Sequence, residues 1–186
     1  ANLILKHAGN GGFIHVVSHL DADGLAAAGV IAKALARLDA AFRIRVERWI
    51  DQEVTASIIA DKPSLIVFTD FGSGDLDILN TQLSNQRLII LDHHQPVGEA
   101  NSPFIHVNPH LHGIDGSRDL SGAGTAYLVA KAIDKANVDL AHVAVVGALG
   151  DLQDKHEQRK LGSVNETIVE DAVNTGYLKI ETDLMF

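Results

Sequence analysis

The chain has 186 residues, of which 46% are hydrophobic and 21% are charged, a composition that can bury one substantial core and excludes fibrous and disordered classes of protein. It contains no cysteine, which excludes disulfide frameworks, thiolate zinc sites and cysteine nucleophiles, so any metal must be held by Asp, Glu or His. The formal charge of −9 has the wrong sign for a binder of polyanions such as nucleic acid, unless bound cations reverse it locally.

Short apolar runs alternate along the chain with amphipathic ones, the first predicting strands and the second predicting helices. The predicted strands span residues 13–17, 42–50, 65–69, 88–91 and 104–107. The predicted helices span residues 25–38, 51–60, 76–83, 121–136 and 140–149. Asp51 is placed to cap the second helix, and Ser163 with Glu166 has the spacing of a capping box at the start of a last helix.

Strands that alternate with helices need crossover connections, so the sequence predicts the α/β class, with a mostly parallel five-stranded sheet flanked by helices and a more helical last third. The segment from Gln95 to Leu120 is rich in Pro, Gly, Asn, Asp and His. It is long for a loop and is therefore either functional or partly ordered. No apolar run approaches the roughly 20 residues that span a bilayer, and no secretory signal is present, so we expect a cytoplasmic protein without membrane contact.

Three of the predicted strands end in acidic or imidazole side chains. These are His19, Asp21 and Asp23 after the first strand, Asp70 after the third, and Asp92, His93 and His94 after the fourth. Because the carboxyl ends of parallel strands share one edge of a sheet, where ligands bind, we expect these side chains to converge. A further acid, Asp151, follows the apolar helix that ends at residue 149 and is placed to close the cluster from the far side.

Such a cluster of carboxylates needs cations, since two unit charges ~4 Å apart repel by on the order of 4 kcal/mol at an effective dielectric of 20. Asp and His without Cys suit Mn²⁺ or Mg²⁺ better than a structural zinc. Asp21 and Asp23 face one way if their segment is extended, whereas in a turn they address two neighbouring ions. Taken singly, Asp21, Asp23 and Asp70 are equally well explained as turn formers or helix caps, and Asp151 as a helix-terminus acid.

Four segments, in this order, resemble the motifs of the DHH phosphoesterase superfamily. They are His19-Leu-Asp21-Ala-Asp23-Gly24, Thr69-Asp70-Phe71-Gly72, Asp92-His93-His94 and Gly147-Ala-Leu-Gly-Asp151. The superfamily includes RecJ-type single-strand exonucleases, phosphodiesterases of nanoRNA and cyclic dinucleotides, and family II inorganic pyrophosphatases. Residues 108–116 and 121–127 are most similar to archaeal RecJ-like proteins, including the GINS-associated nuclease. The resemblance implies that residues 1–186 are the DHH catalytic domain, without the C-terminal DHH-associated domain that helps to grip substrate.

The resemblance also implies roles for the residues of the cluster, around two Mn²⁺ or Mg²⁺ ions. One ion would be held by Asp21 and Asp70, and the other by Asp23, Asp70, His93 and Asp151. His94 would face the substrate phosphate. Asp92 would orient a motif residue rather than bind metal, and His19 would either bind metal or line the site.

The predicted reaction is phosphodiester hydrolysis by a hydroxide held between two cations, as in the RecJ-like exonucleases that act on single-stranded nucleic acid. Two alternatives stay open. One is hydrolysis of small anions such as a short oligonucleotide, a cyclic dinucleotide or pyrophosphate, and the other is a scaffold of little activity that binds replication proteins such as GINS.

Four residues or segments outside the motifs have two interpretations each. Arg118 is either a phosphate contact or a solvated surface residue, and the glycine-rich helix start at residues 121–125 is either a phosphate site or a close-packing device. Trp49 and Tyr127 are interpreted as packing residues rather than base-stacking platforms.

Overall fold

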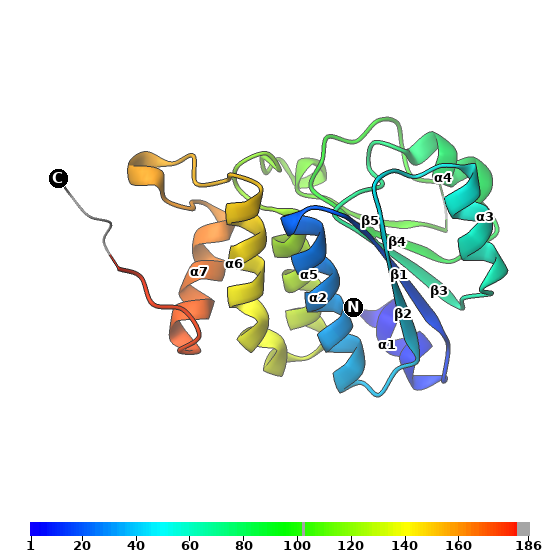
Figure 1. The fold of residues 1–186 in the computed structure, drawn as a ribbon, viewed down its shortest axis with the longest axis horizontal. Coiled ribbons are helices and arrows are strands. Elements are labelled where there is room, and N and C mark those ends of the chain that lie inside the picture. Colours follow the sequence, from blue (N-terminus) through cyan, green and yellow to red (C-terminus); the bar gives the residue numbers. More distant parts are fainter. Residues whose placement is uncertain (102, 182–186) are drawn as a thin grey trace.

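The computed structural model describes residues 1–101 and 103–181 and has a five-stranded parallel sheet with helices on both faces (Figure 1). The strands are β1 (Ile14–His19), β2 (Phe42–Glu47), β3 (Leu65–Thr69), β4 (Leu88–Leu91) and β5 (Ile105–Val107). Their spatial order is β2-β1-β3-β4-β5, and every neighbouring pair is parallel. The predicted α/β class with a five-stranded parallel sheet is confirmed.

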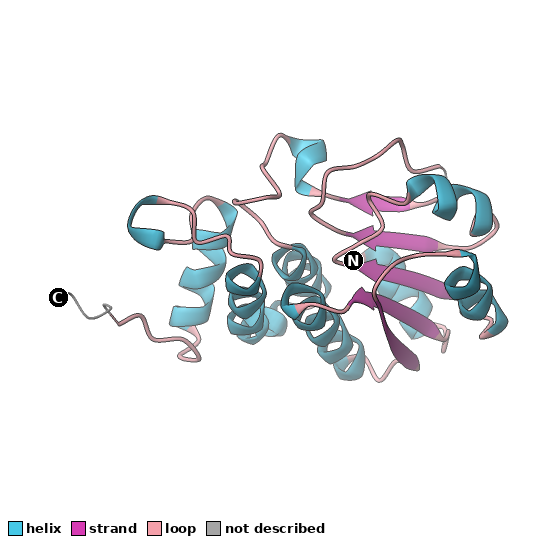
Figure 2. Cartoon of the chain, turned by 45° about the horizontal axis from the view of Figure 1, so that its top comes forward, coloured by secondary structure: helices cyan, strands magenta, loops and turns pink. Residues whose placement is uncertain are grey.

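The helices form layers on the two faces of the sheet (Figure 2). They are α1 (Asn2–Gly9), α2 (Ala22–Arg37), α3 (Gln52–Ala60), α4 (Leu76–Gln82), α5 (Gly122–Ile133), α6 (Ala141–Gly150) and α7 (Val164–Asn174). Helices α3 and α4 cover one face, whereas α2 and α5 cover the other. Helix α6 packs on α2 and α5, and α7 packs on α6, which gives the more helical last third that the sequence predicts. None of these helices in the described residues is long and apolar enough to cross a membrane.

The central strands are apolar throughout because both of their faces are covered. In β1, Val16 joins the core under α2 and α5, whereas Val17 joins the core under α3 and α4. This alternation follows from the two-residue period of a strand. Strand β2 lies at the edge of the sheet, and its Ile44 and Val46 stay exposed.

The order of the strands places a crevice at the ends of β1 and β3. From β1 the chain crosses to β2 on one side, and then returns to β3 on the other side of β1. The loops that follow β1 and β3 therefore leave in opposite directions, and ligands of open α/β sheets bind at such a point. The motif residues after β1 and β3 lie at this switch point.

Four local details differ from the sequence prediction. Helix α1 was not predicted, and β2 ends at Glu47, where its pairing with β1 also ends. Helix α5 ends at Ile133 because Asp134 takes an extended conformation and accepts a hydrogen bond from the next turn. The predicted capping box is wrong, because Ser163 has a φ of 55° instead of an extended backbone and its hydroxyl makes no cap hydrogen bond.

His15, on β1, makes the stability of the fold sensitive to acid. The side chain is fully buried, and neither ring nitrogen has a hydrogen-bond partner, although Nδ1 lies 3.4 Å from a carboxylate oxygen of Asp61. Burial lowers the pKa of His15, and the attraction of Asp61 only partly offsets this. Below the ordinary histidine pKa of about 6.5, the unfolded chain therefore binds a proton more readily than the folded one, so the free energy of unfolding falls as the pH falls.

We expect His15→Leu to weaken this dependence. Between about pH 7 and pH 5, the slope of unfolding free energy against pH should become shallower by up to about 1.4 kcal/mol per pH unit, the value for one proton. Urea titrations of both proteins at several pH values measure the slope. An unchanged slope would mean that His15 takes up a proton in the folded protein as readily as in the unfolded one.

Candidate metal centre

The ends of β1, β3 and β4 and the end of α6 bring the predicted acids and histidines together. Three groups of side chains have ligand atoms that lie within 4.8 Å of one another. Two of the groups have three residues each, and the third has four, including Asp92, His93 and His94. The groups are His19, Asp21 and Asp70; Asp23, His93 and Asp151; and Asp70, Asp92, His93 and His94. The predicted convergence at one edge of the sheet is therefore present, and Asp151 closes it from α6.

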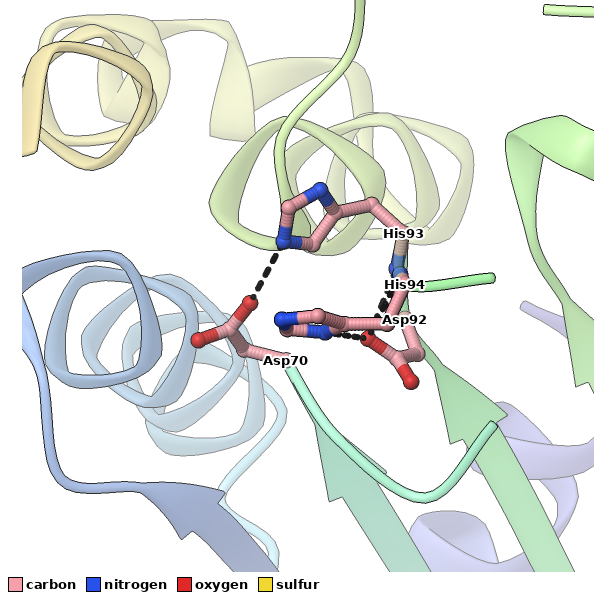
Figure 3. A group of neighbouring side chains, drawn as sticks. All are labelled: Asp70, Asp92, His93 and His94. Atoms are coloured by element: carbon pink, nitrogen blue, oxygen red, sulfur yellow. Dashed lines mark hydrogen bonds and ion pairs between the residues drawn. The ribbon is translucent and has the colours of Figure 1, made fainter. Parts of the chain in front are cut away.

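Asp70 belongs to the first group and contacts His93 of the second. Its Oδ1 is 3.2 Å from Nε2 of His93 (Figure 3). Its Oδ2 is 3.8 Å from Nδ1 of His19. Both carboxylate oxygens are buried without a hydrogen-bond partner, and so is Nε2 of His93. Buried polar atoms are normally paired, so these three unpaired atoms indicate a site for a cation.

The charge of the cluster supports the same conclusion. Burial, together with the negative charges of Asp23, Asp21 and Asp92, raises the pKa of Asp70 to about 11. No Lys or Arg side chain pairs with Asp70 among the described residues. Carboxylate and imidazole donors without thiolates fit Mn²⁺ or Mg²⁺, so the residues present fit the metal that the sequence predicts.

The carboxylates of Asp21 and Asp23 belong to different groups of ligand atoms because a helix begins between the two residues. Asp21 is the N-cap of α2, where Oδ1 accepts a hydrogen bond from the Gly24 amide at 2.9 Å and Oδ2 lies 2.9 Å from Nδ1 of His19. Asp23 lies within the first turn of the helix and is only 1% exposed. Of the two sequence interpretations, the turn that directs the acids to two positions is the one found.

Asp23, although it belongs to α2, accepts hydrogen bonds from the first amides of α5. Its Oδ2 accepts from the Gly122 amide at 2.7 Å and its Oδ1 from the Ala123 amide at 2.9 Å. Burial raises the pKa of Asp23, while His93 and these two amides oppose the shift. The amides at the start of α5 are thus occupied by a carboxylate of the chain, so the phosphate interpretation of this glycine-rich start is not supported, and close packing is.

His93 is held with its Nε2 facing the cluster. Its Nδ1 lies 2.6 Å from the Gly116 carbonyl oxygen, and because a carbonyl only accepts, Nδ1 carries a proton, so in the neutral ring the lone pair is on Nε2. This is the tautomer that binds metal. Gln153 supports the arrangement, since its side-chain amide donates to the Gly116 oxygen at 2.8 Å and to Asp151 at 2.9 Å. Neither Gly116 nor Gln153 was predicted from the sequence. The only signal for Gln153 is its position two residues after Asp151, and Gly116 has none.

Asp92 directs its oxygens to the chain rather than to the cluster. Oδ1 accepts from the amides of His93 and His94 and lies 2.8 Å from Nδ1 of His94, whereas Oδ2 accepts from the Ser73 amide at 2.8 Å. Burial alone would raise the pKa of Asp92, but the hydrogen bonds from His94 and Ser73 lower it. The hydrogen bond to Asp92 in turn raises the pKa of the half-exposed His94. This geometry favours the orienting role expected for Asp92.

Two cavities meet at His94. One, of about 410 Å³, is lined on the side of α6 by His93, His94, His110 and Lys155, among others. The other, of about 250 Å³, is lined on the side of β2 by His19, Trp49, Asp70 and His94, among others. Arg118 lines neither cavity, and its guanidinium donates to Nδ1 of His156 at 3.0 Å. Its contact with substrate stays a prediction.

Comparisons with known proteins place this site in a family. The family model described as the DHH family, N-terminal domain, matches residues 13–150. An uncharacterised protein of Methanocaldococcus jannaschii is 36% identical over 190 residues, covering 98% of this chain and 41% of that protein. A putative prophage-derived single-strand DNA-specific exonuclease of Bacillus subtilis is 25% identical over 168 residues, covering 87% of this chain and 29% of that protein.

A solved structure agrees with these matches. RecJ from Thermus thermophilus, in complex with Mn²⁺, has a TM-score of 0.74 and 25% identity, covering 93% of this chain and 26% of that one. The chain therefore spans less than half the length of each of these three proteins. The family model covers most of the chain, from just before β1 to the end of α6, and this segment supplies the strand ends that form the cluster. The chain belongs to the DHH family and contains its N-terminal domain.

Proposed function

We propose that residues 1–186 form the catalytic domain of a phosphoesterase that uses two divalent cations, Mn²⁺ or Mg²⁺, to hydrolyse phosphodiesters at the ends of single-stranded nucleic acid. The observation that carries the proposal is the position of Asp70, whose two unpaired oxygens face a different group of ligand atoms each. A carboxylate in that position would serve as a ligand in both sets, and a pair of ions held there would suit an in-line displacement at phosphorus.

The residues divide into two ligand sets. Asp21 and Asp70, with His19 beside them, would hold one ion. Asp23, His93 and Asp151 would hold the other, together with Asp70, whose Oδ1 lies 3.2 Å from Nε2 of His93. Ions held there supply a hydroxide near neutral pH and offset the charge of the phosphoryl oxygens.

His94 has a different role from that of His93. Its Nδ1 is held by Asp92, its ring is half exposed between the two cavities, and its charged form is favoured. His94 would therefore donate a proton from Nε2 to the substrate phosphate or to the leaving oxygen.

The preference for single-stranded nucleic acid rests on the similarity to the putative exonuclease of Bacillus subtilis and to RecJ. The net charge of −9 has the wrong sign for binding a polyanion, but divalent cations held by the cluster would offset its carboxylates at the point where the phosphate binds.

Hydrolysis assays test the proposal directly. A labelled single strand, a dinucleotide and pyrophosphate are each incubated with the protein, once with Mn²⁺ and once with a chelator. We expect Mn²⁺-dependent shortening of the single strand and no reaction with the chelator. Turnover of only the small anions would favour the second enzymatic alternative. Absence of turnover, together with capture of replication proteins such as GINS, would favour the scaffold.

A further inference from the structure

The cavity on the β2 side of the cluster has an aromatic wall that the proposed metal chemistry does not use. Trp49 lines this cavity of about 250 Å³ together with Arg48 and Phe71, and the same cavity reaches Asp70 and His94. The side chain of Trp49 is 59% exposed, so its interpretation as a packing residue is wrong. Tyr127, which received the same interpretation, is fully buried.

The segments before and after Trp49 in the sequence are both anchored in the fold. Before it, β2 ends at Glu47. After it, Ile50 is only 3% exposed in the core under α3 and α4, and Asp51 caps α3 through a hydrogen bond from the Val54 amide at 2.8 Å. An exposed indole on such an anchored loop is a preorganised surface, because little conformational entropy remains to be lost when a ligand covers it.

The neighbours of Trp49 give the cavity a mixed aromatic and cationic character. The guanidinium of Arg48 lies over the indole, with Cζ 5.2 Å from the ring centroid. Phe71 lies against Phe68 in an edge arrangement, with centroids 5.5 Å apart, and is held there at 7% exposure. A π-face beside a cation is the combination that binds a nucleobase and its attached phosphate in single-strand binding proteins.

We propose that this cavity is a nucleobase subsite, in which Trp49 stacks on the base of the nucleotide whose phosphate lies at Asp70 and His94. The inference rests on the proposed function and adds to it a contact for the base. Stacking on a π-face tolerates all four bases, so this subsite would not select sequence. Because the aromatic content of the chain is only 5%, the contact is to one base rather than to a run of bases.

A fluorescence titration tests the subsite independently of hydrolysis. Trp49 is the single tryptophan of the chain, so tryptophan emission reports on this position alone. In the presence of Mg²⁺, we expect thymidine 5′-monophosphate to quench the emission with saturation, and deoxyribose 5-phosphate, which has no base, to leave it unchanged. Equal effects of the two compounds, or no quenching by either, would overturn the proposal.

A kinetic comparison separates the subsite from the metal chemistry. We expect Trp49→Ala to raise KM for a single strand by about tenfold, the size of one lost stacking contact, with little change in kcat, and Trp49→Phe to restore most of the affinity. On a strand with abasic residues at both ends, wild type and Trp49→Ala should have the same KM. A loss of equal size on both strands would contradict the proposal.

Tyr177→Ala is the matched control, because Tyr177 is 63% exposed and stacks on His142, which lies at the start of α6, the end opposite to Asp151. Its KM should equal that of the wild type. If the wild type hydrolyses neither strand, the proposed function fails while the fluorescence titration still decides whether the base is bound at Trp49.

Discussion

Asp70→Asn is expected to stabilise the metal-free protein and to remove both its response to Mn²⁺ and its hydrolytic activity. Asp70 is 0% exposed, and its carboxylate has no hydrogen-bond partner. Asparagine keeps the shape of the side chain and is neutral at every pH, so it needs no proton to enter the cluster when the metal-free chain folds. It also tolerates the left-handed backbone of this residue, whose φ is 63°, whereas alanine would add strain.

The raised pKa of Asp70 sets the size and the pH dependence of the gain. At about 11, it exceeds the value of about 3.9 in an unfolded chain, so at pH 7 the carboxyl must take up a proton when the metal-free protein folds, at a cost of at most about 4 kcal/mol. The contribution of Asp70 to the free energy of unfolding is thus fully present below about pH 3.9 and is lost as the pH rises toward 11. The advantage of Asp70→Asn should therefore be large at pH 7 and small near pH 4.

Melting temperatures with chelator and with Mn²⁺ measure the effect. In wild type, Mn²⁺ at a hundredfold excess over its Kd adds about 2.7 kcal/mol, or roughly 5–10 °C for a chain of this size. Asp70→Asn should melt higher than wild type with chelator and should not respond to Mn²⁺. Hydrolysis should fall by roughly a thousandfold, since the lost cations contribute several kcal/mol to the transition state.

Asp39→Asn is the matched control, because Asp39 has a similar φ of 52° but is exposed in the turn after α2. It should alter neither the metal-free stability nor the response to Mn²⁺. If Asp70→Asn kept the Mn²⁺ response, Asp70 would not hold the metal.

The strand ends and their acids could be predicted because their signals are local. An apolar run such as residues 65–69 specifies a buried strand, and the topology of a parallel sheet then gathers the residues that follow each strand. The sequence therefore predicted that Asp21, Asp70 and His93 would meet. The N-cap at Asp51 was predicted for the same reason, since the helix pattern follows it directly.

The supporting contacts could not be predicted because they join segments that are distant in sequence. Asp23 accepts from the Gly122 amide of α5 across 99 residues, and Gln153 reaches the Gly116 carbonyl across 37 residues. The types of the two residues do not predict such a contact, since the acceptor at Gly116 is a backbone carbonyl, which every residue has. The prediction that Trp49 is a packing residue failed for another reason. Hydrophobic side chains are buried on average, but Trp49 follows the edge strand β2, and its side chain is exposed to solvent.

Gly122→Ala is expected to weaken Mn²⁺ binding by about tenfold or more, although it adds only one methyl group and lies outside the four motifs. A Cβ on Gly122 would lie 2.2 Å from Oδ1 of Asp70 and 2.8 Å from its Cβ. The contact involves the Cβ of Asp70 as well as its carboxylate, so either the Asp70 side chain or the first turn of α5 must move. That first turn also donates the Gly122 amide to Asp23, so both ligand sets are displaced.

The magnitude follows from two separate costs. Overpacking in a buried site costs about 1–3 kcal/mol of stability, and displacing the groups that orient metal ligands typically costs roughly 10–100-fold in metal affinity. Isothermal titration with Mn²⁺ measures the affinity, and urea unfolding in chelator measures the stability. Both should fall, and the loss of affinity should persist at temperatures well below the unfolding transition.

Gly29→Ala distinguishes this steric effect from a general effect of replacing glycine in a helix. Gly29 is an exposed residue in the middle of α2, and a Cβ there has no atom within 4 Å. Alanine at that position should raise stability by about 0.5–1 kcal/mol through helix propensity and leave Mn²⁺ affinity unchanged, although α2 carries Asp23. If Gly122→Ala behaved like Gly29→Ala, the start of α5 would not confine the carboxylate of Asp70, and the close approach of backbone to ligand would have no role in placing the metals.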